Sequence, residues 1–134
     1  MTIRLDHTIV PAKNKMESAE FFAEIFGLSV EPGYFAQVRV NDTLTLDFSD
    51  EREDWGEADS DVGPSLHYAF HVDDAEFDAI FRRVQAKGLA YGSEPDDYTN
   101  GRLNHRRGGR GFYFEDPYGH LLEVMTVPET GSTR

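Results

Sequence analysis

The chain has 134 residues, a formal net charge of −12 and no cysteine. The absence of cysteine excludes disulfides, thiolate metal sites and cysteine nucleophiles, so a metal could be held only by His, Asp or Glu side chains. The acidic balance disfavours nucleic acid. The sequence also has no apolar run of bilayer length and no charged-then-apolar leader. We therefore expect a cytoplasmic protein that binds neither nucleic acids nor membranes.

The first half of the chain predicts a strand, a helix and a hairpin. Residues 4–10 alternate between apolar and polar positions, as in a strand. Asn14, with Glu17 three residues later, predicts a helix N-cap, and Gly27 predicts a left-handed stop. The apolar stripe of this helix is formed by Phe21, Phe22, Ile25 and Phe26. Residues 34–40 and 43–48 predict two strands joined at Asn41-Asp42.

The second half predicts the same order of elements. Residues 66–72 alternate, and Asp73 with Glu76 predicts the start of a helix that ends at Gly88. The buried stripe of this helix is formed by Phe77, Ile80, Phe81 and Val84. Residues 111–115 and 120–126 predict two strands joined by a type I turn at Asp116-Pro117-Tyr118-Gly119. His120, next to this turn, is expected to be exposed.

The two halves form a weak internal repeat. His7 lies twenty residues before Gly27, and His67 lies twenty-one residues before Gly88. The repeat predicts an α+β fold of two βαβββ modules. We expect the first module and an acidic linker at residues 1–64, the second module at 65–127, and a frayed tail at 128–134.

Three residues on predicted strands indicate a metal site: His7, His67 and Glu123. Glu123 shares its face with Leu121 and Met125, and a carboxylate among apolar side chains needs a cation or several donors. A single His on an apolar face is usually a core residue bonded to a carbonyl. Two histidines at equivalent points of a repeat, together with an inward carboxylate, instead suit a first-row divalent ion that keeps open coordination positions.

The stretch FYFEDPYGHLLE, from Phe112 to Glu123, is similar to the ring-cleavage signature of extradiol dioxygenases. Over nearly its whole length, the chain resembles the vicinal oxygen chelate superfamily, which includes glyoxalase I, extradiol dioxygenases, and fosfomycin and bleomycin resistance proteins. The resemblance implies a cupped, incomplete barrel and a homodimer in which modules of different chains can complete each site. It also implies a divalent metal, with iron(II) favoured over manganese, nickel, zinc or cobalt.

The resemblance assigns metal ligands. In this family they come from the first strand of each half and the last strand of the second half, which here carry His7, His67 and Glu123. Asp47 stands where glyoxalase-type members add a fourth carboxylate. It is one methylene shorter than the usual Glu, so direct ligation and water-mediated contact are both open.

The resemblance also assigns two catalytic residues. His105, eight residues before Tyr113, matches the signature His and would act as a general acid or base. Tyr113 would donate a hydrogen bond to a substrate oxygen. The alternatives are an exposed loop His and an aromatic residue that only lines the barrel. His71 lies about 13 Å from His67 along the strand, too far to bind the same ion.

The loop at residues 93–110 resembles a mobile flap and carries a cluster of arginines. The cluster consists of Arg102, Arg106, Arg107 and Arg110. Held over the metal cup, it would select an anionic substrate such as a carboxylate or phosphonate. The alternative is an ordinary solvated loop.

Three functions remain open. The first is a metal-dependent enzyme acting on a small oxygenated substrate, with dioxygenase-like chemistry favoured over a glyoxalase-type lyase, isomerase or thiol transferase. The second is a metal-free protein that binds a small molecule or antibiotic, as bleomycin resistance proteins do. The third is a structural protein that has kept the fold and lost the activity.

Overall fold

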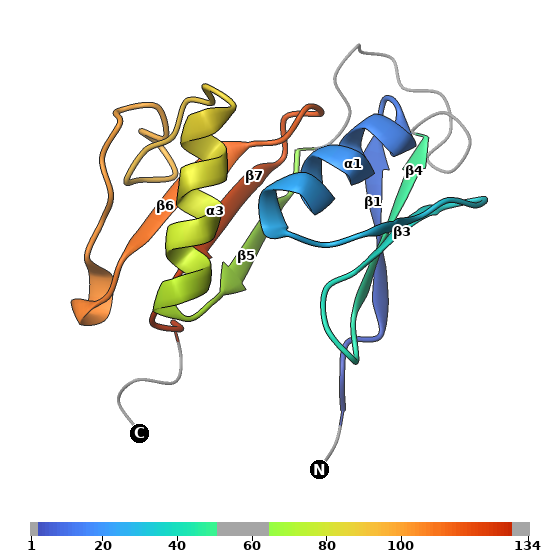
Figure 1. Cartoon of the computed structure of the whole chain (residues 1–134), viewed down its shortest axis with the longest axis horizontal. Coiled ribbons are helices and arrows are strands. Elements are labelled where there is room, and N and C mark those ends of the chain that lie inside the picture. The colour runs from blue at the N-terminus through green and yellow to red at the C-terminus, as the bar shows by residue number, and fades with distance from the viewer. Residues whose placement is uncertain (1–2, 51–64, 130–134) are drawn as a thin grey trace. The chain divides into compact units, whose positions relative to one another are not determined.

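The computed structural model describes residues 3–50 and 65–129 (Figure 1). It divides into two compact units, Met1–Pro64 and Ser65–Arg134. Each unit contains one α-helix lying across one sheet among the described residues. Most of the predicted acidic linker and of the predicted frayed tail lies outside the described residues.

The first unit forms a four-stranded sheet. Its elements are β1 (His7–Ala12), α1 (Lys15–Phe26), β2 (Val30–Glu31), β3 (Ala36–Arg39) and β4 (Thr45–Asp50). The strand order is β1-β4-β3-β2, with β1 and β4 parallel and the other pairs antiparallel. The position of the two-residue strand β2 was not predicted, although a βαβββ module includes such a strand, because so short a strand has no measurable alternation.

Helix α1 begins and ends where the sequence predicts. The Asn14 side chain accepts a hydrogen bond from the Glu17 backbone N–H at 2.9 Å, and Gly27 has a left-handed φ of 71°. The helix packs on β3 and β4. The core between helix and sheet is formed by Val10, Ala19, Phe22, Ile25, Val38, Leu46 and Phe48. Burial of this face holds the helix against the sheet.

The second unit forms a three-stranded sheet with the same connections. Its elements are β5 (His67–His71), α3 (Asp74–Ala86), the 3₁₀ turn η1 (Arg106–Gly108), β6 (Gly111–Glu115) and β7 (Leu121–Met125). The order is β5-β7-β6, with β5 and β7 parallel. An outer strand beside β6 is reduced to an isolated bridge between Gly92 and Tyr113.

Helix α3 covers one face of this sheet (Figure 1), and aromatic side chains form the contacts between them. Phe77 packs edge-on against Phe112 of β6, with ring centroids 5.4 Å apart, and Phe81 lies 5.3 Å from the same ring. Phe77 and Phe112 are both fully buried. Because side chains alternate along a strand, Tyr113 and Glu123 lie on the opposite face of the sheet.

The strand register repeats between the two units. In the first unit, Asp47 of β4 is paired with Ile9 of β1, two residues after His7. In the second unit, Glu123 of β7 is paired with Ala69 of β5, two residues after His67. Each sheet therefore carries a His on its first strand and a carboxylate on its last strand, at matching positions and on the same face.

The turn between β6 and β7 buries polar groups that the sequence does not reveal. One oxygen of Asp116 accepts three backbone N–H bonds at 2.9 Å, from Tyr118, Gly119 and His120. Burial raises the pKa of Asp116, although these hydrogen bonds and the neighbouring His120 act in the opposite direction. The predicted turn is confirmed by the Gly119 N–H, which donates to the Asp116 carbonyl at 3.0 Å.

His120 corrects an expectation. Its place beside the turn indicated an exposed side chain, yet it is fully buried. Its Nδ1 accepts a hydrogen bond from the Leu66 backbone N–H at 3.0 Å, and its ring lies between those of Tyr68 and Tyr118. The prediction was wrong because this hydrogen bond connects residues far apart in the sequence.

No helix in the described part of the chain is both long and apolar enough to span a bilayer.

The N-cap of α3 provides a test of this local structure. The Asp73 side chain accepts a hydrogen bond from the Glu76 backbone N–H at 2.8 Å. Asp73→Ala should lower the free energy of unfolding by about 1 kcal/mol, because the N–H loses its acceptor. Asp73→Asn keeps an acceptor and should change stability by less than half as much. Urea denaturation of the two variants measures the difference, and equal losses would contradict the assigned cap.

Candidate functional site

The candidate site lies on the face of the second sheet that α3 does not cover. All three strands contribute to it, and the loop at residues 92–110 borders it. The cavity there has a volume of about 630 Å³, a size that accommodates a small organic molecule. Its lining consists of His67, Ala69, His71, Pro95, Arg106, Arg107, Tyr113, Glu123, Met125 and Glu129.

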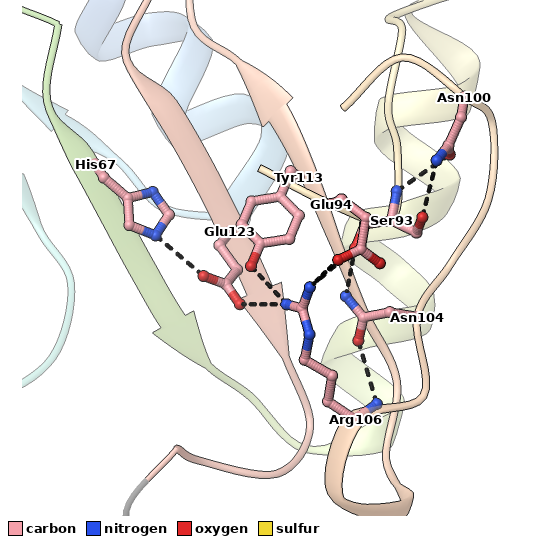
Figure 2. Close-up of polar contacts among 8 residues, drawn as sticks. All are labelled: His67, Ser93, Glu94, Asn100, Asn104, Arg106, Tyr113 and Glu123. Atoms are coloured by element: carbon pink, nitrogen blue, oxygen red, sulfur yellow. Dashed lines mark hydrogen bonds and ion pairs between the residues drawn. The ribbon is translucent and has the colours of Figure 1, made fainter. Parts of the chain in front are cut away.

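His67 and Glu123 face each other across the paired strands β5 and β7 (Figure 2). The imidazole Nε2 lies 3.0 Å from a carboxylate oxygen of Glu123, and Nδ1 lies 2.9 Å from the Leu121 carbonyl oxygen. A carbonyl can only accept, so Nδ1 carries a proton. In the neutral ring, the lone pair of Nε2 then points at the carboxylate. These two groups repel each other unless a cation lies between them. The pair therefore requires either a proton or a metal ion.

The donor atoms of this pair fit a divalent metal. Two ligand atoms that are each about 2.1 Å from an ion lie about 3 Å apart when the ligands are at right angles. An Nδ1–H bond to a carbonyl is also the usual way in which a protein orients a metal-binding His. The side chain of Glu123 is only 14% exposed, whereas that of His67 is 47% exposed. The donors are thus accessible from the cavity.

The structure brings together two of the three predicted metal ligands. Within residues 3–50 and 65–129, no cluster of three His, Asp or Glu side chains surrounds one point. His7 belongs to the first unit, and the prediction that it joins His67 and Glu123 stays a prediction.

The first unit holds the other two predicted residues, His7 and Asp47. His7 is exposed, and its Nδ1 lies 2.7 Å from a carboxylate oxygen of Asp6. This hydrogen bond is the largest cause of the raised pKa of His7, and the charge of Asp47 contributes further. Asp47 is buried and accepts a hydrogen bond from the Gln37 amide at 3.2 Å. Direct metal binding by Asp47 stays a prediction.

Tyr113 lies beside Glu123 on the neighbouring strand β6. Its phenol oxygen accepts a hydrogen bond from an Arg106 N–H at 2.6 Å (Figure 2). Burial raises the pKa of Tyr113, the guanidinium of Arg106 lowers it in part, and Glu123 raises it again. Since Arg106 donates to the oxygen, the phenol proton can be directed at Glu123 or at a molecule in the cavity.

Arg106 links the site to the loop above it. Its guanidinium lies between Glu94 on one side and Tyr113 and Glu123 on the other (Figure 2). It forms a close ion pair with Glu94 and lies 3.9 Å from a carboxylate oxygen of Glu123. Three charged groups and one phenol therefore share a single network with His67.

The loop is built by amide side chains rather than by regular structure. The Asn104 amide donates to the Ser93 carbonyl at 2.9 Å, and the Asn100 amide donates to the Ser93 hydroxyl at 2.8 Å. Gly92 exchanges two backbone hydrogen bonds with Tyr113, at 2.8 and 3.0 Å. Only glycine fits at position 92, because a Cβ there would lie 2.4 Å from the Asp97 carbonyl oxygen. These bonds fix the approach of Arg106 to the sheet.

The predicted catalytic role of His105 stays a prediction. Its side chain is exposed and is not among those that line the cavity. The next residue, Arg106, lines the cavity and donates a hydrogen bond to Tyr113. The reason is local: His105 precedes the 3₁₀ turn η1, and the turn directs the next two side chains to the cavity.

The arginine cluster divides into two groups. Arg106 and Arg107 line the cavity, in agreement with the hypothesis that guanidinium groups lie over the site. Arg110 instead binds Asp74 and Asp78 of α3 at 2.9 and 2.7 Å. Arg102 is exposed and does not line the cavity.

A family model of the Glyoxalase/Bleomycin resistance protein/Dioxygenase superfamily matches residues 4–124 of this chain. The chain belongs to this superfamily. Its α+β fold of two modules, predicted from the repeat, is thereby confirmed. The modules of this member are the two units described above.

Individual relatives in this superfamily are enzymes of different kinds. The structure of oxidase ChaP-H2 is 42% identical, with a TM-score of 0.86, and the match covers 98% of this chain and 99% of that one. Glutathione transferase FosA from Serratia marcescens is 25% identical over 123 residues, 90% of this chain and 78% of that protein. Lactoylglutathione lyase from Agrobacterium tumefaciens shares the fold, at 21% identity and a TM-score of 0.71 over 96% of each chain.

Arg106 is the site residue that reasoning from the sequence did not single out. It was one of four clustered arginines, and nothing in the spacing separates it from its neighbours. One signal was available: Asn104 precedes Arg106 by two residues, and an Asn before a turn often bonds the backbone ahead of it. Its side chain accepts the Arg106 backbone N–H at 3.3 Å.

Proposed function

We propose that this chain is a metal-dependent enzyme that oxidises a small molecule carrying two neighbouring oxygen atoms, with chemistry of the dioxygenase type. The observation that carries the proposal is the pair of His67 and Glu123, whose donor atoms lie 3.0 Å apart with the imidazole proton held on Nδ1. The 42% identity to a chain named as an oxidase supports oxidation over the other reactions of the superfamily.

The metal would be held by His67 and Glu123, with His7 as the third ligand and Asp47 as a further candidate. A divalent ion there, iron(II) before manganese, nickel, zinc or cobalt, would polarise the bound oxygens and, if redox-active, would mediate the transfer of electrons from the substrate to dioxygen. Two imidazoles and one carboxylate leave coordination positions open for substrate. We expect a homodimer, as the resemblance implies.

The chain's own residues have separate tasks in this proposal. Tyr113 donates its phenol proton as a hydrogen bond to a substrate oxygen, because Arg106 already occupies its acceptor side. Arg106 holds the phenol in place and balances the charges of Glu94 and Glu123. Met125 and Ala69 give the cavity an apolar wall against which the bound molecule can pack.

A second candidate is transfer of a thiol such as glutathione to a small electrophile. The similarity to glutathione transferase FosA favours it, and a metal could activate either reaction. The two candidates differ in the molecule that is consumed along with the substrate, which is dioxygen in the first and a thiol in the second.

The test follows both co-substrates in the same preparation. Protein purified without chelator is reconstituted separately with iron(II), manganese, nickel, cobalt and zinc. Dioxygen uptake is then recorded with a panel of catechols, and thiol loss is recorded with glutathione and an epoxide. We expect metal-dependent dioxygen uptake that a chelator abolishes. Thiol loss without dioxygen uptake would favour the second candidate, and failure to bind any of these ions would contradict both.

A further inference from the structure

The two arginines that line the cavity differ in how they are bonded. Arg106 has its donors occupied by Tyr113, Glu94 and the Ser93 carbonyl. Arg107 makes no hydrogen bond, ion pair or ring contact with any other described residue. A guanidinium offers five N–H donors, so Arg107 presents a cation with unused donors to the cavity.

The backbone of Arg107 is in an unusual conformation. Its φ of 55° and ψ of 26° are left-handed, and among the described residues it is the one non-glycine with a positive φ. Such a conformation costs about 1 kcal/mol or more for a residue with a side chain, and it persists where a function requires it. Glycine would adopt it without cost, as the next residue, Gly108, does with a φ of 79°. The chain thus has an arginine where glycine would be more stable.

Two acidic side chains also line the cavity. Glu123 is paired with His67 and lies near Arg106. Glu129 also lines the cavity, and no bond joins it to Arg107 among the described residues. Neither carboxylate therefore occupies the N–H donors of Arg107 among the described residues.

We propose that Arg107 determines specificity by binding an acidic group of the substrate. The substrate class is then a small molecule with two neighbouring oxygens at one end and a carboxylate or phosphonate at the other. The first part of this description rests on the proposed function, and the acidic group rests on Arg107 alone. A guanidinium binds either acid through paired N–H bonds, so the two acids are separated by experiment.

The test compares ligands that differ by one charge. The protein is loaded with Zn²⁺, which has no redox chemistry, so that bound ligands are not consumed. The probes are catechol, protocatechuate, the phosphonate analogue of protocatechuate, and benzoate, which has an acid and no diol. Calorimetry gives each affinity in the native chain and in Arg107→Gln, Arg107→Lys and Arg102→Gln. Arg102 is the matched control, because it is an exposed arginine of the same loop outside the cavity lining.

We expect the native chain to bind at least one of the two acidic diols about tenfold or more tightly than catechol, as a charge-assisted hydrogen bond does. Arg107→Gln should abolish that preference and leave catechol affinity unchanged, Arg107→Lys should keep part of it, and Arg102→Gln should keep all of it. Of the carboxylate and the phosphonate diol, the one that binds more tightly identifies the acidic group of the substrate. Equal affinities in the native chain, or a preference that survives in Arg107→Gln, would overturn the proposal.

Failure of the proposed function gives a different result. If catechol does not bind in a metal-dependent way, while benzoate binds and loses affinity in Arg107→Gln, the metal-dependent function fails and the anion site stands. If catechol binds with metal and the acid adds nothing, the function stands and the anion site fails. In thermal melts, Arg107→Gly should be at least as stable as the native chain, because glycine adopts the left-handed conformation without cost. A less stable Arg107→Gly would show that the backbone at this position is not strained.

Discussion

Replacement of Glu123 by Gln is expected to lower the affinity for a divalent metal by at least about a hundredfold, or about 2.7 kcal/mol. The amide keeps the size of the side chain and removes the charge that faces His67 at 3.0 Å. Changes to groups that only support a metal ligand cost about ten- to a hundredfold, so loss of a direct carboxylate ligand should cost at least as much. His67→Ala should have an effect of similar size.

The measurement is a competition titration against a chromophoric chelator, together with the metal content of the purified protein. Glu129→Gln is the matched control, since Glu129 lines the same cavity and no hydrogen bond or ion pair joins it to His67 among the described residues. It should change the affinity by less than about threefold, through long-range charge alone. Unchanged metal binding in Glu123→Gln would show that this carboxylate is not a ligand.

Replacement of Phe112 by Ala is expected to destabilise the protein by about 3–5 kcal/mol. Phe112 is fully buried and contacts Phe77, Phe81, Tyr91 and Phe114. Removing its ring leaves a cavity at the centre of the second unit that the surrounding rings cannot fill. Denaturant unfolding, followed by the circular dichroism of the helices, measures the loss.

The neighbouring residue provides the contrast. Tyr113 lies on the opposite face of the same strand, and Tyr113→Phe removes only the hydroxyl that Arg106 contacts. We expect a loss of stability no larger than about 1.5 kcal/mol and a marked loss of activity. Similar stability losses in Phe112→Ala and Tyr113→Phe would contradict the assignment of one face to the core and the other to the site.

Local patterns in the sequence were sufficient to predict most of the fold. The helix caps at Asn14 and Asp73 depend on a side chain and a backbone N–H three residues apart, so a short stretch contains both partners. The positions of β5 and β7 follow from alternation, which also places His67 and Glu123 on one face. Two of the proposed metal ligands were found in this way.

Features that depend on distant contacts or irregular backbone could not be predicted. His120 is buried because Leu66, remote in sequence, donates to its ring. The contact of Arg106 with Tyr113 could not be predicted, because η1 turns the chain there with a left-handed residue that no periodic pattern indicates. The hydrogen bonds of Gly92, Asn100 and Asn104, which join the loop to itself and to the sheet, could not be predicted either.

The most direct test is the anomalous-scattering map of a crystal of the metal-loaded protein. Everything proposed about the reaction requires one cation shared by an imidazole and a carboxylate on parallel strands. We predict a metal peak within about 2.3 Å of both His67 Nε2 and a carboxylate oxygen of Glu123. A map in which these two atoms contact each other directly, with the metal absent or bound elsewhere, would contradict the account.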